Sequence, residues 1–225
     1  MNRFITAFIL SAFTLASCSP KYKIEGESSI SYLDGKMLFL RQFQHDRFTT
    51  IDSAEVVHGF FNMKGHIDST QMAMLFMDDM PVMPVVLEKG GIRVIINNTE
   101  IRAKGTPMND SLYNFFDRKN QIELRMTELK RKEAKMILDG GDIDDIQTAL
   151  HQEAQAVNEE MKQLIKSFLA QNSDNVLGPG VFLILCQSSS PAMMPQIEEM
   201  IAEMPESFKS NPAIKDCLSQ LQRPE

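Results

Sequence analysis

The sequence predicts an α+β fold, in which an N-terminal antiparallel β-sandwich or open barrel over residues 18–105 is followed by a helical domain over residues 106–225. Before Gly105, apolar residues alternate with polar ones in short runs, which is typical of strands. After Gly105 they recur every three or four positions, which is typical of amphipathic helices. Asp139-Gly140-Gly141-Asp142 divides this helical pattern once, so we expect a helical hairpin followed by short C-terminal helices.

The β-rich part contains about eight short runs of strand type, separated by glycine or polar residues. His58-Gly59 is a two-residue turn signal, so residues 48–57 and 60–63 are expected to form a β-hairpin. The close spacing of the runs favours antiparallel sheets over a parallel α/β sheet. The expected strands cover residues 22–24, 36–41, 48–57, 60–63, 71–77, 82–87, 91–96 and 100–103.

Two apolar ladders predict two amphipathic helices of about 30 residues each, which lie antiparallel because their connection is short. Gly140 or Gly141 is expected to supply the left-handed cap of the first helix. Asp142, Asp144 and Asp145 suit the start of the second helix, where acids favour the helix dipole. The first ladder consists of Leu112, Phe115, Ile122, Met126, Leu129 and Met136, with Lys119 and Glu133 at its two polar steps. The second consists of Ile143, Ile146, Leu150, Ala154, Val157, Met161, Leu164 and Phe168.

Past Asn172 the helices become shorter. Gly178-Pro179-Gly180 is expected to interrupt the chain before a buried helical segment at residues 181–187. Residues 191–204 and 212–221 each open with a proline, which favours the first turn of a helix, and predict two further short helices.

The first seventeen residues have the features of an export signal. Arg3 is their only charged residue, and residues 4–16 are mostly apolar but shorter than the roughly 20 residues that a bilayer-spanning helix needs. The run closes on Leu15-Ala16-Ser17-Cys18, which resembles the lipobox of bacterial lipoproteins, whose cysteine is acylated before cleavage. We therefore expect removal of residues 1–17 and a lipid on Cys18. The alternative is an ordinary signal peptide with an incidental cysteine.

An acylated Cys18 anchors a protein to the lipid bilayer, since two or more acyl chains hold it stably. Ser19 rather than aspartate follows the cysteine, and by resemblance to Gram-negative lipoproteins this favours the outer membrane, with the folded part facing the periplasm. Removal of the signal takes away Arg3 and no acid, so 22 basic residues remain against 30 acidic ones, a net charge of −8. That balance argues against nucleic acid as a partner.

Two cysteines remain in the mature chain besides Cys18. A disulfide between Cys186 and Cys217 is one hypothesis for an exported protein, and two buried free thiols are the alternative. Neither cysteine belongs to a Cys-x-x-Cys motif, so the sequence lacks the site of a thiol oxidoreductase.

Methionines are crowded in one stretch, and Met77-x-x-Met80-x-x-Met83 has the spacing of thioether copper sites. The alternative is that these side chains fill an irregular core, because methionine is abundant throughout the chain. The stretch contains Met72, Met74, Met77, Met80 and Met83.

No catalytic constellation is found in the sequence. The histidines lack the spacing of a zinc hydrolase, and residues 142–153 fail the calcium-loop pattern because Ile146 and Gln147 occupy its fifth and glycine positions. Nucleophile-elbow and phosphate-loop motifs are missing as well. We therefore expect no cofactor and no enzymatic activity. The histidines are His45, His58, His66 and His151.

Several motifs together resemble an uncharacterised bacterial domain, domain-of-unknown-function family 4369. They are Ile51-Asp52-Ser53-Ala54, Gly59-x-Phe61-x-x-x-Gly65, Leu87-Glu88-x-Gly90, and Gly105-Thr106 with Asn109. The resemblance covers nearly the whole mature chain, and it implies the N-terminal part of a thioredoxin-like lipoprotein of the peroxide-reductase superfamily. In longer relatives a Trp-Cys-x-x-Cys domain begins about where this chain stops. This sequence has no Trp and no paired cysteines, so no redox residue carries over.

Two functions are consistent with the sequence: a non-enzymatic envelope lipoprotein that binds a protein partner or a ligand, and an auxiliary of a separate periplasmic thioredoxin-like protein. Asp52, Glu88 and Asn109 are interpreted as turn and capping residues, with Asp52 bonding to backbone at a bulge. Lys130-Arg131-Lys132 is most simply a solvated helix face, and contact with anionic headgroups near the anchor is the alternative.

Overall fold

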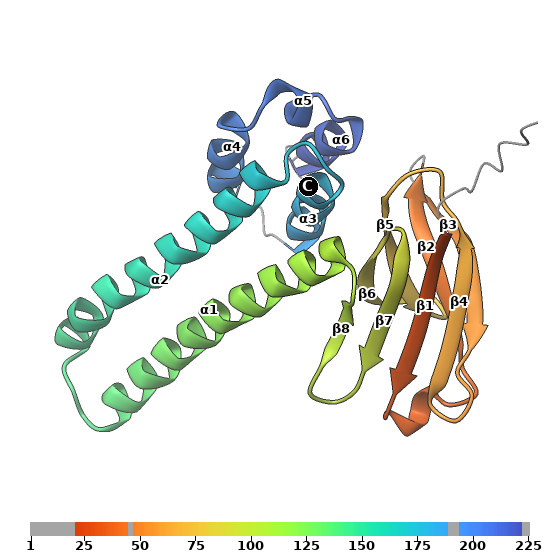
Figure 1. Ribbon diagram of the computed structural model, residues 1–225. Helices are drawn as coiled ribbons and strands as arrows, with labels where there is room; N and C mark the ends of the chain where they lie inside the picture. Colours follow the sequence, from red (N-terminus) through yellow and green to blue (C-terminus); the bar gives the residue numbers. More distant parts are fainter. Residues whose placement is uncertain (1–20, 45–46, 189–193, 222–225) are drawn as a thin grey trace, which may run out of the picture.

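A computed structural model describes residues 21–44, 47–188 and 194–221 of the chain. A two-layer β-sandwich stands at one side, and a long helical hairpin reaches away from it (Figure 1). The shorter helices gather beside the sandwich-proximal end of that hairpin. The α+β class expected from the sequence is thereby confirmed.

Eight strands form two four-stranded sheets in the described part of the chain, so the sandwich rather than an open barrel is correct. Sheet A has the order β4-β1-β7-β8, and sheet B the order β3-β2-β5-β6. The strands are β1 (Lys21–Ser28), β2 (Met37–Gln44), β3 (Arg47–Glu55), β4 (Phe60–His66), β5 (Gln71–Met77), β6 (Met80–Leu87), β7 (Gly90–Ile96) and β8 (Ile101–Lys104), and a single 3₁₀ turn covers Ser31–Leu33.

One strand pair runs parallel, which the sequence did not predict. In the centre of sheet A, β1 lies between β4 and β7; its pairing with β4 is antiparallel, and its pairing with β7 is parallel. Ile24 is aligned with Met63 on one side and with Ile92 on the other. The alternation of apolar residues reports which face of a strand is buried, but it does not report the direction of the neighbouring strand.

The expected hairpin around His58-Gly59 is wrong, although its turn is present. Both turn residues have positive φ, 52° and 78°, and Val57 and Phe60 exchange backbone hydrogen bonds of 2.9 and 3.0 Å. Nevertheless β3 belongs to sheet B and β4 to sheet A. Beyond the turn, Val56 bonds to the start of β2 through Lys36, so the two strands diverge. The turn is therefore a corner that carries the chain from one sheet to the other.

Asp52 links the two sheets. It lies beside a β-bulge in the β2–β3 register, as interpreted from the sequence. One carboxylate oxygen accepts hydrogen bonds from the Tyr22 hydroxyl and the Lys64 backbone N–H, both at 3.1 Å, and the other accepts the Ser53 N–H at 2.8 Å. Burial, followed by the nearby Asp52 charge, raises the pKa of Tyr22 above its ordinary value. The side chain thus has a structural role.

The helical hairpin is confirmed. Its two helices are buried along the expected ladders, and Phe115 packs on Phe168 with ring centroids 4.4 Å apart. Gly140 adopts the left-handed conformation at φ 84°, and Asp142 caps the second helix by accepting two backbone N–H bonds. The helices are α1 (Pro107–Leu138), α2 (Ile143–Gln171), α3 (Leu177–Ser188), α4 (Met194–Ala202), α5 (Glu206–Lys209) and α6 (Pro212–Leu221).

Three local expectations differ from the structure. Ile143 is 55% exposed, because it begins α2 at the tip of the hairpin, where no neighbour covers it. Gly178-Pro179-Gly180 lies inside the first turn of α3 rather than before it, a position in which proline is tolerated because the first N–H groups need no helical partner. The short helix α5 was not expected.

A buried polar cluster joins helix α1 to the sandwich. The Asn109 side chain accepts the Val86 N–H at 2.9 Å and donates to the Val86 carbonyl and to Thr106 Oγ1, both at 2.8 Å. Glu88 accepts the backbone N–H groups of Met108 and Asn109 at 2.8 and 3.2 Å. Glu88 is therefore a capping residue of α1, as interpreted from the sequence, whereas the Asn109 side chain bonds to the backbone of β6 instead of capping the helix.

The hydrophobic core is continuous from the sandwich into the helices. Helix α3 lies close against sheet B, since a Cβ at Gly180 would stand 2.7 Å from the Met72 side chain of β5. The two parts of the fold are thus packed together at α1 and again at α3. Among the described helices, none combines the length and the apolar character needed to cross a membrane.

We predict that Asn109→Leu destabilises the protein strongly. The substitution introduces an apolar side chain of similar size and leaves the Val86 N–H and carbonyl without partners in a site where Asn109 is fully buried. Each orphaned group costs about 1–3 kcal/mol, so the free energy of unfolding should fall by about 3 kcal/mol in urea titrations. Asn62→Ala, at an exposed position of β4, is the control and should change it by less than about 0.5 kcal/mol. A loss at Asn109 no larger than in this control would contradict the assignment.

Candidate functional site

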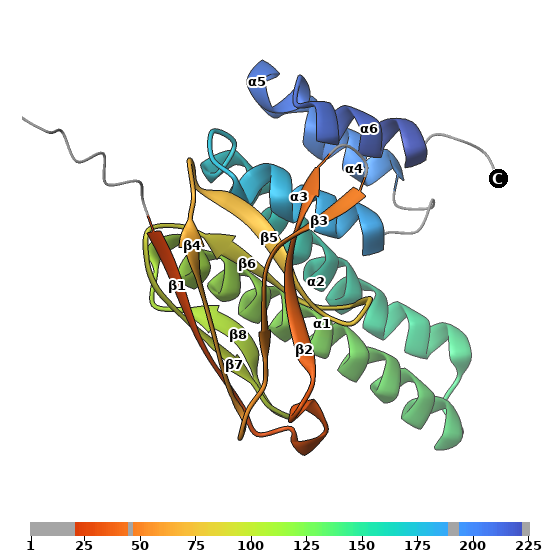
Figure 2. The same ribbon diagram turned by 90° about the vertical axis from the view of Figure 1, so that its right-hand side faces the viewer.

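The expected lipid attachment site, Cys18, lies outside the described residues. The first described residue is Lys21, which begins β1 at one end of the sandwich. In two perpendicular views this end and the tip of the α1–α2 hairpin lie on opposite sides of the molecule (Figures 1 and 2). A tether near Lys21 therefore leaves the hairpin pointing away from the point of attachment.

The hairpin forms an arm. Helix α1 has 32 residues, which gives it a length of about 48 Å at 1.5 Å per residue. It contacts β6 and β8, and its outer half lies beside α2 and away from the sandwich (Figure 1). Ion pairs between Arg125 and Glu160, and between Lys132 and Glu153 at 3.1 Å, connect the two helices of the arm. Such exposed pairs contribute little stability, so the buried ladder is what holds the arm together.

The tip of the arm, residues 137–145, is apolar at its centre and acidic around it. Leu138 is 86% exposed, and Ile137 and Ile143 are about half exposed on the two sides of the connecting loop. Four carboxylates surround them, at Asp139, Asp142, Asp144 and Asp145, all of them exposed. Single exposed apolar residues are ordinary, but three that adjoin at the end of a projection are typical of a contact surface.

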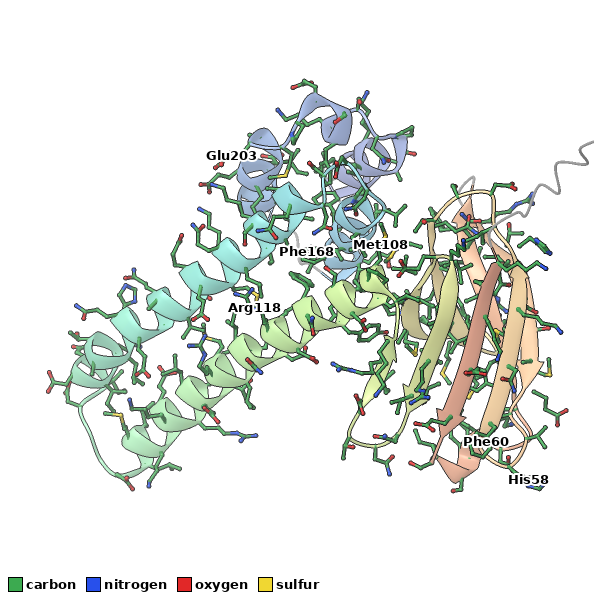
Figure 3. All side chains as sticks on the ribbon, viewed as in Figure 1. His58, Phe60, Met108, Arg118, Phe168 and Glu203 are labelled. Atoms are coloured by element: carbon green, nitrogen blue, oxygen red, sulfur yellow. The ribbon has the colours of Figure 1, made fainter. Side chains whose placement is uncertain are left out.

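Several hollows of the described surface run along the hairpin. One of about 390 Å³ lies between the first turns of α1 and the last turns of α2, with Phe115 and Phe168 among its apolar lining residues. Arg118 of α1 and Phe168 of α2 line it from the two sides (Figure 3), together with Asn114 and Gln171. The polar residues of this lining give the groove hydrogen-bonding groups beside its two phenylalanines.

The methionines of the copper hypothesis do not converge. Met77 and Met83 are buried in the sandwich core, and the sulfur of Met77 accepts a hydrogen bond from the Tyr32 hydroxyl. Met80 is 57% exposed at the β5–β6 turn. Met72 and Met74 line a small apolar pocket of about 110 Å³ between sheet B and α3. This distribution favours the core-filling interpretation.

Cys186 and Cys217 lie side by side where α3 packs on α6. Cys186 is 3% exposed and Cys217 is half-buried, and both are free thiols in the structure. Burial, and then the neighbouring Cys217, raises the pKa of the Cys186 thiol above its ordinary value. The disulfide stays a hypothesis, since the structure brings the two residues together in the reduced form.

The described histidines lie in a turn, at a strand end and on a helix surface. His58 forms the corner turn, His66 ends β4 and His151 lies exposed on α2, whereas His45 is outside the described residues. In the part of the chain that the structure describes, no three His, Cys, Asp or Glu side chains are grouped as metal ligands.

The basic run at residues 130–132 lies in the outer half of α1, on the arm and far from the start of β1. Lys132 bonds to Glu153 of α2. The alternative that this run touches headgroups close to the anchor is therefore not favoured, and the interpretation as a solvated helix face is.

Comparison with protein families shows that residues 22–112 match the model of the family described as Domain of unknown function (DUF4369). The match covers the sandwich except Lys21, the first residue of β1, and the first turns of α1, including the buried cluster around Asn109, and it ends before the rest of the helices. The resemblance inferred from the sequence motifs is thus shown for the sandwich and the junction. Comparison with curated proteins and with solved structures found no match.

We predict that Cys186 makes the reduced protein lose stability in alkali. A thiol with a raised pKa stays protonated in the folded chain while the unfolded chain ionises near its ordinary value of about 8.5. The stabilisation is therefore complete below that pH and is lost as the pH rises through the folded pKa. In urea titrations under reducing conditions, Cys186→Ala should flatten the decline between about pH 7.5 and 9.5 relative to the unsubstituted chain. An unchanged slope would show that another group causes the decline.

Proposed function

We propose that this chain, with its DUF4369-like sandwich, is an outer-membrane lipoprotein of the cell envelope that faces the periplasm and binds a protein partner through the tip of its helical hairpin. The protein acts as an interaction module without catalysis. Acylated Cys18 attaches it to the bilayer, and the sandwich serves as the base from which the arm projects.

The observation that carries the proposal is the exposed apolar centre of the tip at the end of a long arm. A helix of 32 residues with polar outer faces is not needed to complete the sandwich core, since only its first half contacts strands. The length of α1 is explained if the tip of the hairpin binds a partner. Leu138, 86% exposed and flanked by two further apolar residues, is the side chain most available for a partner.

The carboxylates around the tip indicate the charge of the partner's surface. Four acidic residues in nine positions repel an anionic membrane surface, and they complement a protein surface with an apolar socket and a basic rim. The partner is therefore a protein rather than a second lipid layer.

The non-enzymatic part of the proposal is supported by the use of the buried polar groups. The buried side chains of Glu88, Thr106 and Asn109 bond to the start of α1 or to β6, and Asp52 bonds to backbone and to Tyr22. These polar groups are occupied by structural bonds, so none of them is free to act on a substrate.

We predict that Cys18→Ser releases the protein from the membrane fraction or leaves it uncleaved. Mass spectrometry of the unsubstituted chain should find a mature N-terminus at Cys18 with the mass of its acyl chains, and the variant should lack that mass. Cys217→Ser is the matched control and should be acylated normally, because Cys217 lies in α6. A mature N-terminus at another residue would refute the anchoring.

We also predict that a photo-reactive amino acid at position 138 captures a discrete partner in living cells, whereas the same amino acid at position 124 does not. Leu124 is the matched control, since it is 56% exposed on α1 but lies away from the tip. Ile143→Asp should reduce the adduct at position 138 severalfold without lowering stability, because Ile143 is exposed and contributes little to the core. Equal capture at both positions, or none at either, would refute the tip as the binding site. Recovery of a thioredoxin-like protein would identify the auxiliary redox role as the purpose of the binding.

A further inference from the structure

The outer face of sheet A is basic at the end where the chain emerges from its expected anchor. The strand register places Lys23 of β1 beside Lys64 of β4. Two positions further along β1, the next row of outward-facing residues contains Arg93 of β7 and Lys104 of β8. Lys21 begins the same face. We call these five residues the basic face.

Acidic residues are scarce in these rows. Residues that are register partners point to the same side of a sheet. The three rows of residues at the level of Lys21, Lys23 and Glu25 contain one carboxylate, Glu25, which forms an ion pair with Lys23. All members of the basic face are exposed except Lys104, which is half-buried. In a mature chain with an excess of eight acids, the basic face has a local charge opposite in sign to that of the whole chain.

The distance from the anchor is short. Three residue steps separate Cys18 from Lys21, and a fully extended chain spans at most about 3.5 Å per step, or about 10 Å in total. That length is close to the Debye length at physiological salt, within which charges on a protein and on headgroups attract one another. An acyl group on Cys18 therefore holds the start of sheet A at the level of the headgroups.

We propose that the basic face lies on anionic phospholipid headgroups of the leaflet that holds acylated Cys18. The inference rests on the proposed lipid anchor and adds to it the orientation of the folded part. Charge complementarity and the short distance to Cys18 together select this side of the sandwich, because an anionic leaflet attracts cations that are held at its surface. The arm then points away from the membrane, since its tip and the start of β1 lie on opposite sides in both views (Figures 1 and 2).

The test uses the mature acylated protein in lipid nanodiscs. Amine-reactive labelling is followed by mass spectrometry at Lys64 and Lys104, with Lys130 of the arm and Lys215 of α6 as exposed controls. In discs with about 30% anionic lipid, labelling of Lys64 and Lys104 should be about fivefold slower than in purely zwitterionic discs, and high salt should abolish the difference. The controls should be labelled equally in both.

Paired charge reversals sharpen the test. Lys64→Glu with Lys104→Glu should remove the anionic-lipid protection of Lys21, whereas Lys130→Glu with Lys215→Glu, which changes the net charge equally, should leave it intact. Equal labelling of Lys64 in both kinds of disc, or equal effects of the two variant pairs, would overturn the proposal. Protection seen only in native envelope vesicles would also overturn it and would indicate an acidic protein on this face.

The two proposals fail in different ways. A chain without acyl groups does not enter the discs, and the anchor is then refuted. The same unacylated chain is next mixed with anionic vesicles, where the reversal at Lys64 and Lys104 should lower co-sedimentation at least about fivefold and the control pair should not. Equal co-sedimentation of both variants would refute the basic face independently of the anchor.

Discussion

The architecture depends on the paired hydrogen bonds between the Asn109 side chain and the backbone of Val86. These two bonds attach the first turn of α1 to strand β6. A helix that begins inside a core also exposes backbone N–H groups that water cannot reach, and Glu88 Oε1 accepts two of them, those of Met108 and Asn109. Because the root of α1 is fixed in this way, the direction of a helix about 48 Å long is set at its first turn.

The long helices and their ends were predictable because the residues that form them are close neighbours in the chain. The 3.6-residue ladder identified both long helices, and even their polar steps at Lys119 and Glu133 proved to be half-buried. The helix ends also followed from residue type: Gly140 has the required positive φ, and Asp142 accepts the N–H groups of the next turn. These features depend on neighbours within four positions, which a single sequence contains.

The pairing of strands that are far apart in the chain was not predictable, because it depends on residues outside any local pattern. The His58-Gly59 signal correctly predicted a turn. Whether the strand after the turn stays in the same sheet depends on two other contacts, the bond from Val56 to Lys36 and the pairing of β4 with β1. A local sequence pattern does not encode these contacts. The basic face was missed likewise. Lys21, Lys64 and Lys104 are far apart in the chain, and only the sheet register makes them neighbours.

The residues behind the family resemblance have a structural explanation throughout. A Cβ at Gly65 would stand 2.7 Å from the Tyr22 ring beside Asp52, and Gly105 has a φ of +94° where strand β8 turns into α1. With Glu88 and Asn109, these positions maintain the sandwich and the root of the helix. The tip of the arm lies outside the match at residues 22–112. A scaffold fixed by buried polar bonds can keep its fold while the surface of the arm varies, so the proposed binding site at the tip depends on none of the residues behind the resemblance.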